Sequence, residues 1–450
     1  MVKSNSTTSI SVFTGLLLVS FLQFFRTSFF LTWDEWTVLS SLASNPFSVW
    51  LAQTHMGHFF PMSKLFYFAE IAVFKDHYTF FLATNCLMNA LTGYCLYKLL
   101  VRLEIRQGIC VVCSMIYVMS YAQFEAISVG MTVMNFISAI FLLLSLIHQY
   151  DYLKEKKQAS FVYSCIFSAC SCLSFGVGIV APLINIIFAF CLYFRIPHHR
   201  VFYVSLVNLV LFVVFAATYM YFTNHSYHAG YHPGAISRPQ GLLSLDTFTS
   251  LRFLFALSAG VLGVPVKYLL LPPDLDAFAT LGISLAVTLA VAAVLYRRYK
   301  IPRLTYYIFL YFLVMAILCG LTAMSRTGPS GLLCCLGQRY QTLYLLPVLA
   351  ALAFLANRIG ASTGPKKVSR IMFAAYALFF LVFNTIHLAR LDKSYHQIRQ
   401  PRLARQKYFD FKSRVLQDPE DAVYSKAVFF DTMNPDLTHE ELAAIIRRVL

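Results

Sequence analysis

The feature that most constrains this chain is a succession of apolar blocks, each about 20 residues long, separated by short polar segments. A helix of that length rises about 30 Å, which matches the hydrocarbon thickness of a bilayer. A helix also satisfies its backbone hydrogen bonds within one segment, as hydrocarbon requires. The sequence therefore predicts an all-α, polytopic integral membrane protein.

Composition and charge agree with this prediction. Of the 450 residues, 58% are hydrophobic and 12% are charged, whereas soluble domains carry about 25% charged residues. The net charge of this chain is +16, and a strongly positive charge is also common in proteins that bind nucleic acids. Here, however, Lys and Arg cluster between apolar blocks, as a membrane-topology signal does, so membrane lipids rather than nucleic acid are the expected partners.

The basic clusters predict the side of the membrane that each loop faces. Residues 98–106, 154–157 and 195–200 mark three cytoplasmic loops, because such loops are enriched in Lys and Arg. Segment 251–271 is expected to be interfacial or re-entrant, since counting it as a span would place two short basic loops outside. The result is about 11 transmembrane helices, with the N-terminus inside and the C-terminus outside, and twelve as the alternative. Spans are expected near residues 10–31, 78–97, 108–124, 131–149, 160–176, 178–194, 201–222, 277–296, 304–323, 340–357 and 371–390.

The chain is expected to form one transmembrane domain, residues 1–390, followed by a short outer tail, residues 391–450. Residues 32–76 would form an outer loop with interfacial helices. Residues 224–276 would form a second outer loop that contains the re-entrant or interfacial helix. The tail ends in residues 436–450, a predicted amphipathic helix at the periphery.

Four polar groups fall on the predicted outer face, although they come from distant parts of the chain. They are Trp33-Asp34-Glu35-Trp36, His55 with His58, the loop containing His228 and His232, and Arg326 with Arg339 and Tyr340. Ionisable groups at membrane depth are costly and usually face a cavity. Because all four groups are expected at the same depth of the membrane, we predict that they form a functional site.

Asp34 and Glu35 are adjacent, so on a helix their side chains would point about 100° apart. We therefore expect one carboxylate to take part in the reaction and the other to hold it or the substrate in place. A carboxylate at the membrane boundary is suited to general-base catalysis. The alternative is an interfacial acid hydrated at a helix end, between Trp anchors.

His55 and His58 lie three residues apart and would share a helix face. This spacing permits a metal pair, hydrogen bonds to a phosphate or sugar, or plain interfacial histidines. A metal would need a further ligand, and His228 and His232 show no tight metal spacing. A divalent metal is therefore not favoured, and we expect no cofactor.

Arg326 and Arg339 bracket a loop that contains Gly and Pro, and Tyr340 follows directly. Guanidinium groups hold phosphate through paired hydrogen bonds, and a helix start after Arg339 would add a positive dipole end. These residues predict a phosphate site. The alternative is that the arginines extend to lipid headgroups.

An apolar first span and an aromatic-Asp-Glu sequence are followed by THMGHFFPMSKL, SFGVGIVAPL, FLFALSAGVLGVP and SRTGPSGLLCCLGQRYQTL. This succession resembles bacterial multi-pass members of the GT-C glycosyltransferase superfamily, which includes protein O-mannosyltransferases and lipid A aminoarabinose transferases. The resemblance runs from about Trp33 to Pro347. It implies an inverting transferase that moves a hexosyl or pentosyl group from a polyprenyl-phosphate carrier to a glycan or lipid acceptor of the cell envelope. The active site would face the periplasm from the bacterial inner membrane.

By position, the resemblance implies that Asp34 is the base that activates the acceptor hydroxyl, and that Glu35 orients Asp34 or the acceptor. The loop with His228 and His232 is a candidate acceptor loop. The residues that would surround the donor phosphate are His55, His58, Lys64, Arg326, Arg339 and Tyr340. One departure is Phe59 after His58, where relatives often carry Arg.

Three other functions fit a chain of this kind. A transporter or flippase of a lipid-linked glycan would use a similar number of helices, but it would place ionisable groups near the bilayer midplane and commonly shows two repeated halves. A cell-envelope polymerase or acyltransferase would also use an Arg or His at the outer face. A structural membrane subunit is a third alternative.

Overall fold

Before residue 226, the structure has a helix at each apolar block of the sequence. The computed structural model describes residues 6–24, 33–55, 59–120, 123, 126–127, 129–192, 197–225 and 439–449, with isolated positions at 343–357 and 406–413. Their regular elements are α1 (Ser6–Phe24), α2 (Trp33–Ser44), α3 (Phe47–Ala52), α4 (Pro61–Phe74), α5 (Tyr78–Arg102), α6 (Gln107–Met119), the 3-10 helix η2 (Gly130–Thr132), α8 (Val133–Glu155), α9 (Gln158–Ser174), the 3-10 helix η3 (Gly176–Val180), α10 (Ala181–Leu192), α11 (His198–His225) and α20 (His439–Arg448). The all-α prediction is confirmed for this part of the chain.

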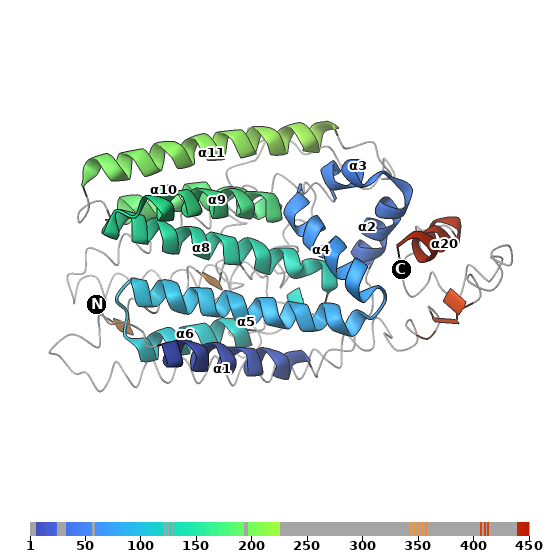
Figure 1. Ribbon diagram of the computed structural model, residues 1–450, viewed down its shortest axis with the longest axis horizontal. Coiled ribbons are helices and arrows are strands. Elements are labelled where there is room, and N and C mark those ends of the chain that lie inside the picture. Colours follow the sequence, from blue (N-terminus) through green and yellow to red (C-terminus); the bar gives the residue numbers. More distant parts are fainter. Residues whose placement is uncertain are drawn as a thin grey trace, which may run out of the picture.

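The long helices lie side by side along the long axis of the molecule (Figure 1). α8 is largely buried and contacts α5 on one side and α9 and α10 on the other. α1 and α6 pack against α5, and α11 packs against α10. The short helices α2, α3 and α4 lie together at one end of this bundle, with α20 beside them (Figure 1). The predicted first outer loop is therefore a helical cap on the bundle.

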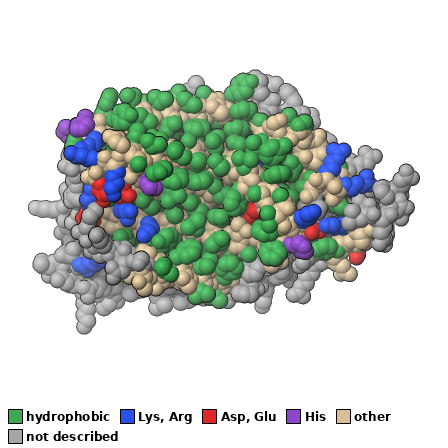
Figure 2. All heavy atoms as spheres, in the orientation of Figure 1, with side chains coloured by type: hydrophobic (Ala, Val, Ile, Leu, Met, Phe, Trp, Pro, Cys, Tyr) green, Lys and Arg blue, Asp and Glu red, His purple; other side chains and the backbone are tan. Residues whose placement is uncertain are grey.

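The surface of the bundle separates into an apolar middle and charged ends. Figure 2 shows apolar side chains across the middle of one face, and Lys, Arg, Asp and Glu toward its two ends. Large apolar side chains such as Val162, Phe202 and Val213 are exposed on α9 and α11. Among the described residues, two helices have the length and hydropathy to cross a bilayer, Gly130–Glu155 and His198–Phe222, and shorter apolar helices accompany them. This distribution fits a bundle whose sides face hydrocarbon.

All seven spans predicted before residue 226 coincide with helices. The spans predicted beyond it lie outside the described residues, except for isolated helical positions between 343 and 357. Segment 251–271 and most of the predicted tail also lie outside them. The total of about 11 helices therefore stays a prediction.

A line of serines brings α8 and α9 close together. Ser164 Oγ of α9 donates a hydrogen bond to the Ser145 carbonyl of α8 at 2.9 Å, and Ser171 Oγ donates to the Ser138 carbonyl at 3.0 Å. Small residues allow helix backbones to approach, and their hydroxyls join the two helices where water is absent. The chain then turns through η3, where Gly178 lies against α9.

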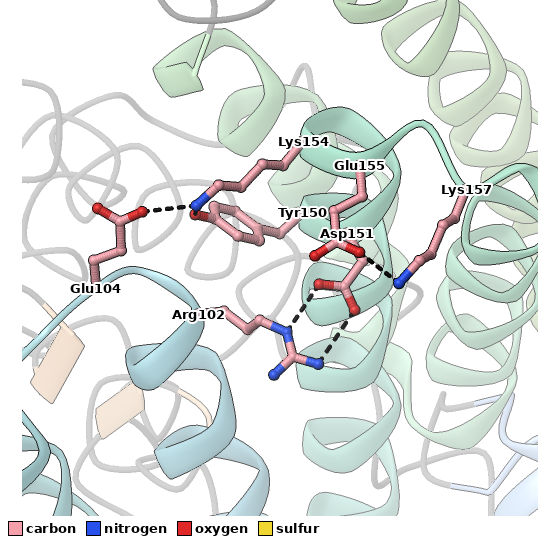
Figure 3. A network of polar contacts seen from close by, with 7 residues as sticks. All are labelled: Arg102, Glu104, Tyr150, Asp151, Lys154, Glu155 and Lys157. Atoms are coloured by element: carbon pink, nitrogen blue, oxygen red, sulfur yellow. Dashed lines mark hydrogen bonds and ion pairs between the residues drawn. The ribbon is translucent and has the colours of Figure 1, made fainter. Parts of the chain in front are cut away.

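The end of the bundle opposite the cap carries an ion-pair network, which Figure 3 shows. Arg102, at the end of α5, contacts both carboxylate oxygens of Asp151 on α8, at 2.8 and 3.4 Å. Lys154 pairs with Glu104 at 2.7 Å. The loops near residues 98–106 and 154–157 therefore lie at the same end, as expected for two loops on one side of a membrane.

Candidate active site

The acidic pair of the sequence lies in the first turn of α2, at the capped end of the bundle. Asp34 is the second residue of this helix, and its side chain is outside the described part of the chain. Glu35 follows and is fully buried, with 0% exposed. Its Oε1 accepts a hydrogen bond from the Met131 backbone N–H at 3.1 Å, and its Oε2 accepts one from the Tyr78 hydroxyl at 3.2 Å. Glu35 therefore anchors the first turn of α2 to α5 and η2.

Gly130 allows η2 to close over this carboxylate. Its backbone N–H donates to the Tyr78 hydroxyl at 3.0 Å, so Tyr78 accepts from η2 and donates to Glu35. A Cβ atom at position 130 would lie 2.7 Å from Glu35 Oε1 and 3.3 Å from the Cβ of Phe81. A side chain at position 130 would therefore displace the Glu35 carboxyl group from its present place.

A second carboxylate, Glu70, lies near Glu35 on the buried face of α4, one turn after Tyr67. Burial raises the pKa of Glu70 to about 8; the Thr84 hydroxyl opposes this rise, and the charge of Glu35 adds to it. Burial and the charge of Glu35 also raise the pKa of Tyr67. Two buried carboxylates in one region of low dielectric resist ionising together. At neutral pH the raised pKa therefore favours the protonated form of Glu70.

This protonated acid predicts a pH-dependent stability that Glu70→Gln should remove. The ordinary pKa of 4.5 applies to Glu70 in the unfolded chain, and the pKa of about 8 applies in the folded protein. Between these values the folded protein binds more protons, so the free energy of unfolding falls as the pH rises from 4.5 to 8. The glutamine has no proton to lose, so at pH 9 we expect the variant to be more stable by on the order of 3 to 5 kcal/mol.

Melting temperatures of the purified protein in detergent, measured from pH 5 to pH 9, provide the test. The native protein and the Gln variant should melt at similar temperatures near pH 5 and diverge above it. Parallel pH profiles for the two proteins would show that Glu70 is ionised at neutral pH.

His55 and Lys64 lie on the same cap, beside α3. His55 is buried, and its ring meets the Phe60 ring edge-on at 6.3 Å. Lys64 is also buried, and its ammonium group donates to the carbonyls of Trp50 at 2.5 Å and Gln53 at 2.7 Å. Burial lowers the pKa of Lys64 to about 7. The contacts of Lys64 thus cap the C-terminal end of α3, and a contact with a donor phosphate stays a prediction.

The other predicted site residues lie outside the described part of the chain. These are His58, His228, His232, Arg326, Arg339 and Tyr340. Their roles stay predictions. Within the ranges that the structure does describe, no three His, Cys, Asp or Glu side chains form a group that could hold a metal ion.

The sequence reasoning missed three residues of this cluster: Tyr67, Glu70 and Tyr78. Glu70 had a signal, because it is the acid within the otherwise apolar stretch FYFAEIAVF, and an ionisable residue in such a stretch commonly has a function. Tyr67 and Tyr78 gave no comparable signal. Aromatic residues are frequent in this chain, 16% of all residues, so one tyrosine does not stand out.

The fold and the site together define an all-helical bundle capped by short helices that hold a buried acidic cluster. No protein-family model matches the chain, and no curated protein matches it. Among solved structures, the crystal structure of the apo oligosaccharyltransferase from Archaeoglobus fulgidus is similar, with 13% sequence identity and a TM-score of 0.49. The match covers 99% of this chain and 64% of that enzyme.

Proposed function

We propose that this chain is an integral membrane glycosyltransferase of the GT-C type that uses a polyprenyl-phosphate-linked sugar as donor. The observation that carries the proposal is the position of Asp34 in the first turn of α2, at the end of an apolar bundle, directly before the anchored Glu35. A lipid-linked donor stays in the bilayer with its phosphate at headgroup depth. Its catalytic base must therefore lie at an end of the bundle, where α2 lies.

The proposed reaction is a single displacement with inversion at the anomeric carbon. The Asp34 carboxylate takes the proton of the acceptor hydroxyl, and the acceptor oxygen forms a bond to the anomeric carbon. The bond between that carbon and the phosphate oxygen breaks, and polyprenyl phosphate leaves with the electron pair. A carboxylate in the first turn of a helix is favoured in its charged form by the helix dipole, which suits a base.

Glu35 has the supporting role in this proposal. Its hydrogen bonds from Met131 and Tyr78 fix the first turn of α2 relative to α5 and η2. Catalysis gains from groups that are held in place before the reaction begins. An anchored turn therefore gives the neighbouring Asp34 a defined backbone position.

The donor phosphate needs positive charge when it leaves. Arg326 and Arg339 are proposed for this role, because guanidinium groups bind phosphate in a paired geometry and stabilise developing negative charge. His55, His58 and Tyr340 are proposed to donate hydrogen bonds to the same group. The acceptor is a glycan or lipid of the cell envelope, and the site faces the periplasm of a bacterial inner membrane.

The proposal is tested by incubating the purified, reconstituted protein with a panel of polyprenyl-phosphate sugars. We expect one donor to be consumed with release of polyprenyl phosphate, and the glycosidic product to show the inverted anomeric configuration. Movement of a labelled lipid-linked sugar across the vesicle bilayer without its consumption would contradict the proposal and indicate a flippase.

A further inference from the structure

The last helix of the chain, α20, packs against α2 (Figure 1). It is the most extensive neighbour of α2 within the described residues. Ile445 and Ile446 of α20 are 0% and 3% exposed and belong to the main apolar core. A helix of ten residues is marginal by itself in water. Its contact with α2 and the core therefore stabilises it, and it is not the peripheral appendage that the sequence predicts.

The contact includes a specific hydrogen bond at the far end of α2. Arg448 Nη1 donates to the Ala43 carbonyl at 2.9 Å. Ala43 lies in the last turn of α2, where carbonyl groups have no partner within the helix, and a cation at this end also meets the negative end of the helix dipole. Arg448 thus holds the C-terminal end of α2, and Glu35 holds its first turn.

A second contact joins the same region of the chain to the helical cap. Lys412 forms an ion pair with Asp76, which lies just after α4. Both side chains are largely buried, at 20% and 9% exposed, so solvent screens this pair less than a surface pair. Lys412 and Arg448 therefore contact the cap at two points, Asp76 and Ala43.

From these contacts we propose that α20 is a clasp that positions α2 for sugar transfer, with Arg448 as a positioning residue. The proposal rests on the proposed function, because the consequence of releasing the clasp is a change in the transfer rate. α2 carries Asp34, and a base that is free to shift by about 1 Å loses much of its effect. Releasing α20 should therefore lower the turnover rate and leave the binding of the donor unchanged.

The main test compares Arg448→Ala with Arg447→Ala in the full chain. Both arginines are exposed neighbours on α20, so the two variants lose the same charge, but Arg448 holds α2. We expect Arg448→Ala to lower kcat about tenfold with the KM for the donor unchanged, and to speed hydrogen–deuterium exchange of the α2 amides. Arg448→Lys should restore most of the lost turnover rate and of the lost protection from exchange, and Arg447→Ala should lower kcat less than Arg448→Ala does.

A charge reversal tests the second contact in the same way. Lys412→Asp should lower the turnover rate, because two acids then face each other. Combining it with Asp76→Lys should restore the rate, because the pair is re-formed with its signs exchanged.

The exchange measurement separates this proposal from the proposed function. Unchanged exchange of α2 in Arg448→Ala would overturn the clasp. Faster exchange with an unchanged transfer rate would overturn its positioning role and leave the transferase proposal in place. A native protein that consumes no donor would instead overturn the transferase, and exchange alone would then decide whether α20 holds α2.

Discussion

Asp34→Asn is expected to lower sugar transfer by about a thousandfold or more, with the protein still inserted at its normal level. The carboxamide has nearly the size of the carboxylate but cannot take the proton of the acceptor hydroxyl at neutral pH. Position 34 lies in the first turn of α2, where Asn is tolerated as well as Asp. The loss should therefore appear in kcat, while donor binding and the melting temperature change little.

The neighbouring substitution Glu35→Gln is the matched control for Asp34→Asn. It replaces the carboxyl group of the next residue, which is buried and whose oxygens accept hydrogen bonds from Met131 and Tyr78. We expect it to lower the free energy of unfolding by about 1 to 3 kcal/mol, and to reduce transfer far less than Asp34→Asn does. Transfer at the native rate by Asp34→Asn would remove Asp34 from the mechanism. Complete loss in Glu35→Gln at unchanged stability would assign the base to Glu35.

Gly178→Ala is expected to have the largest effect on stability among the described glycines. A Cβ atom at this position would lie 1.9 Å from the Ser171 carbonyl oxygen and 2.7 Å from Ser138 Oγ. The first of these atoms is backbone and cannot move aside by a change of rotamer, so η3 and α9 must separate. Forced overpacking of this kind costs about 1 to 3 kcal/mol and sometimes more, and we expect at least the upper value here.

Gly108→Ala provides the control for this substitution. Position 108 lies in α6, and a Cβ atom there would meet nothing within 4 Å. Alanine is a better helix former than glycine, so this variant should be as stable as the native protein or more stable by up to about 1 kcal/mol. Melting curves of both variants in detergent give the measurement. Equal melting temperatures for Gly178→Ala and the native protein would mean that α8, α9 and η3 pack less closely than the structure shows.

The sequence predicted the helices well because the signals for them are local. The length and hydropathy of each apolar block predict a helix without reference to the rest of the chain. For α9 the predicted and observed bounds differ by two residues at each end, as helix ends usually do, whereas α5 and α8 continue five and six residues beyond their predicted ends. Basic clusters near residues 98–106 and 154–157 likewise indicated two loops on one side, and the structure joins them by ion pairs.

The candidate site was only partly predictable. Adjacency indicated that Asp34 and Glu35 differ in role, since neighbouring side chains on a helix diverge. It could not indicate which acid is buried, because that depends on where α5 and η2 pass. Lys64 shows the same limit: its role at a phosphate stays a prediction that the resemblance implies, and no sequence pattern indicated that its ammonium group would contact the carbonyls of Trp50 and Gln53 at the end of α3.

The sequence by itself determined the class of fold, the positions of the helices before residue 226 and the acidic pair at the start of α2. Only the tertiary structure decided what surrounds that pair. Glu35 meets partners 43 and 96 residues away, and α2 is held at its other end by a residue 405 positions along the chain. Such contacts follow from how whole helices pack, and hydropathy, which acts within one segment, contains no information about them.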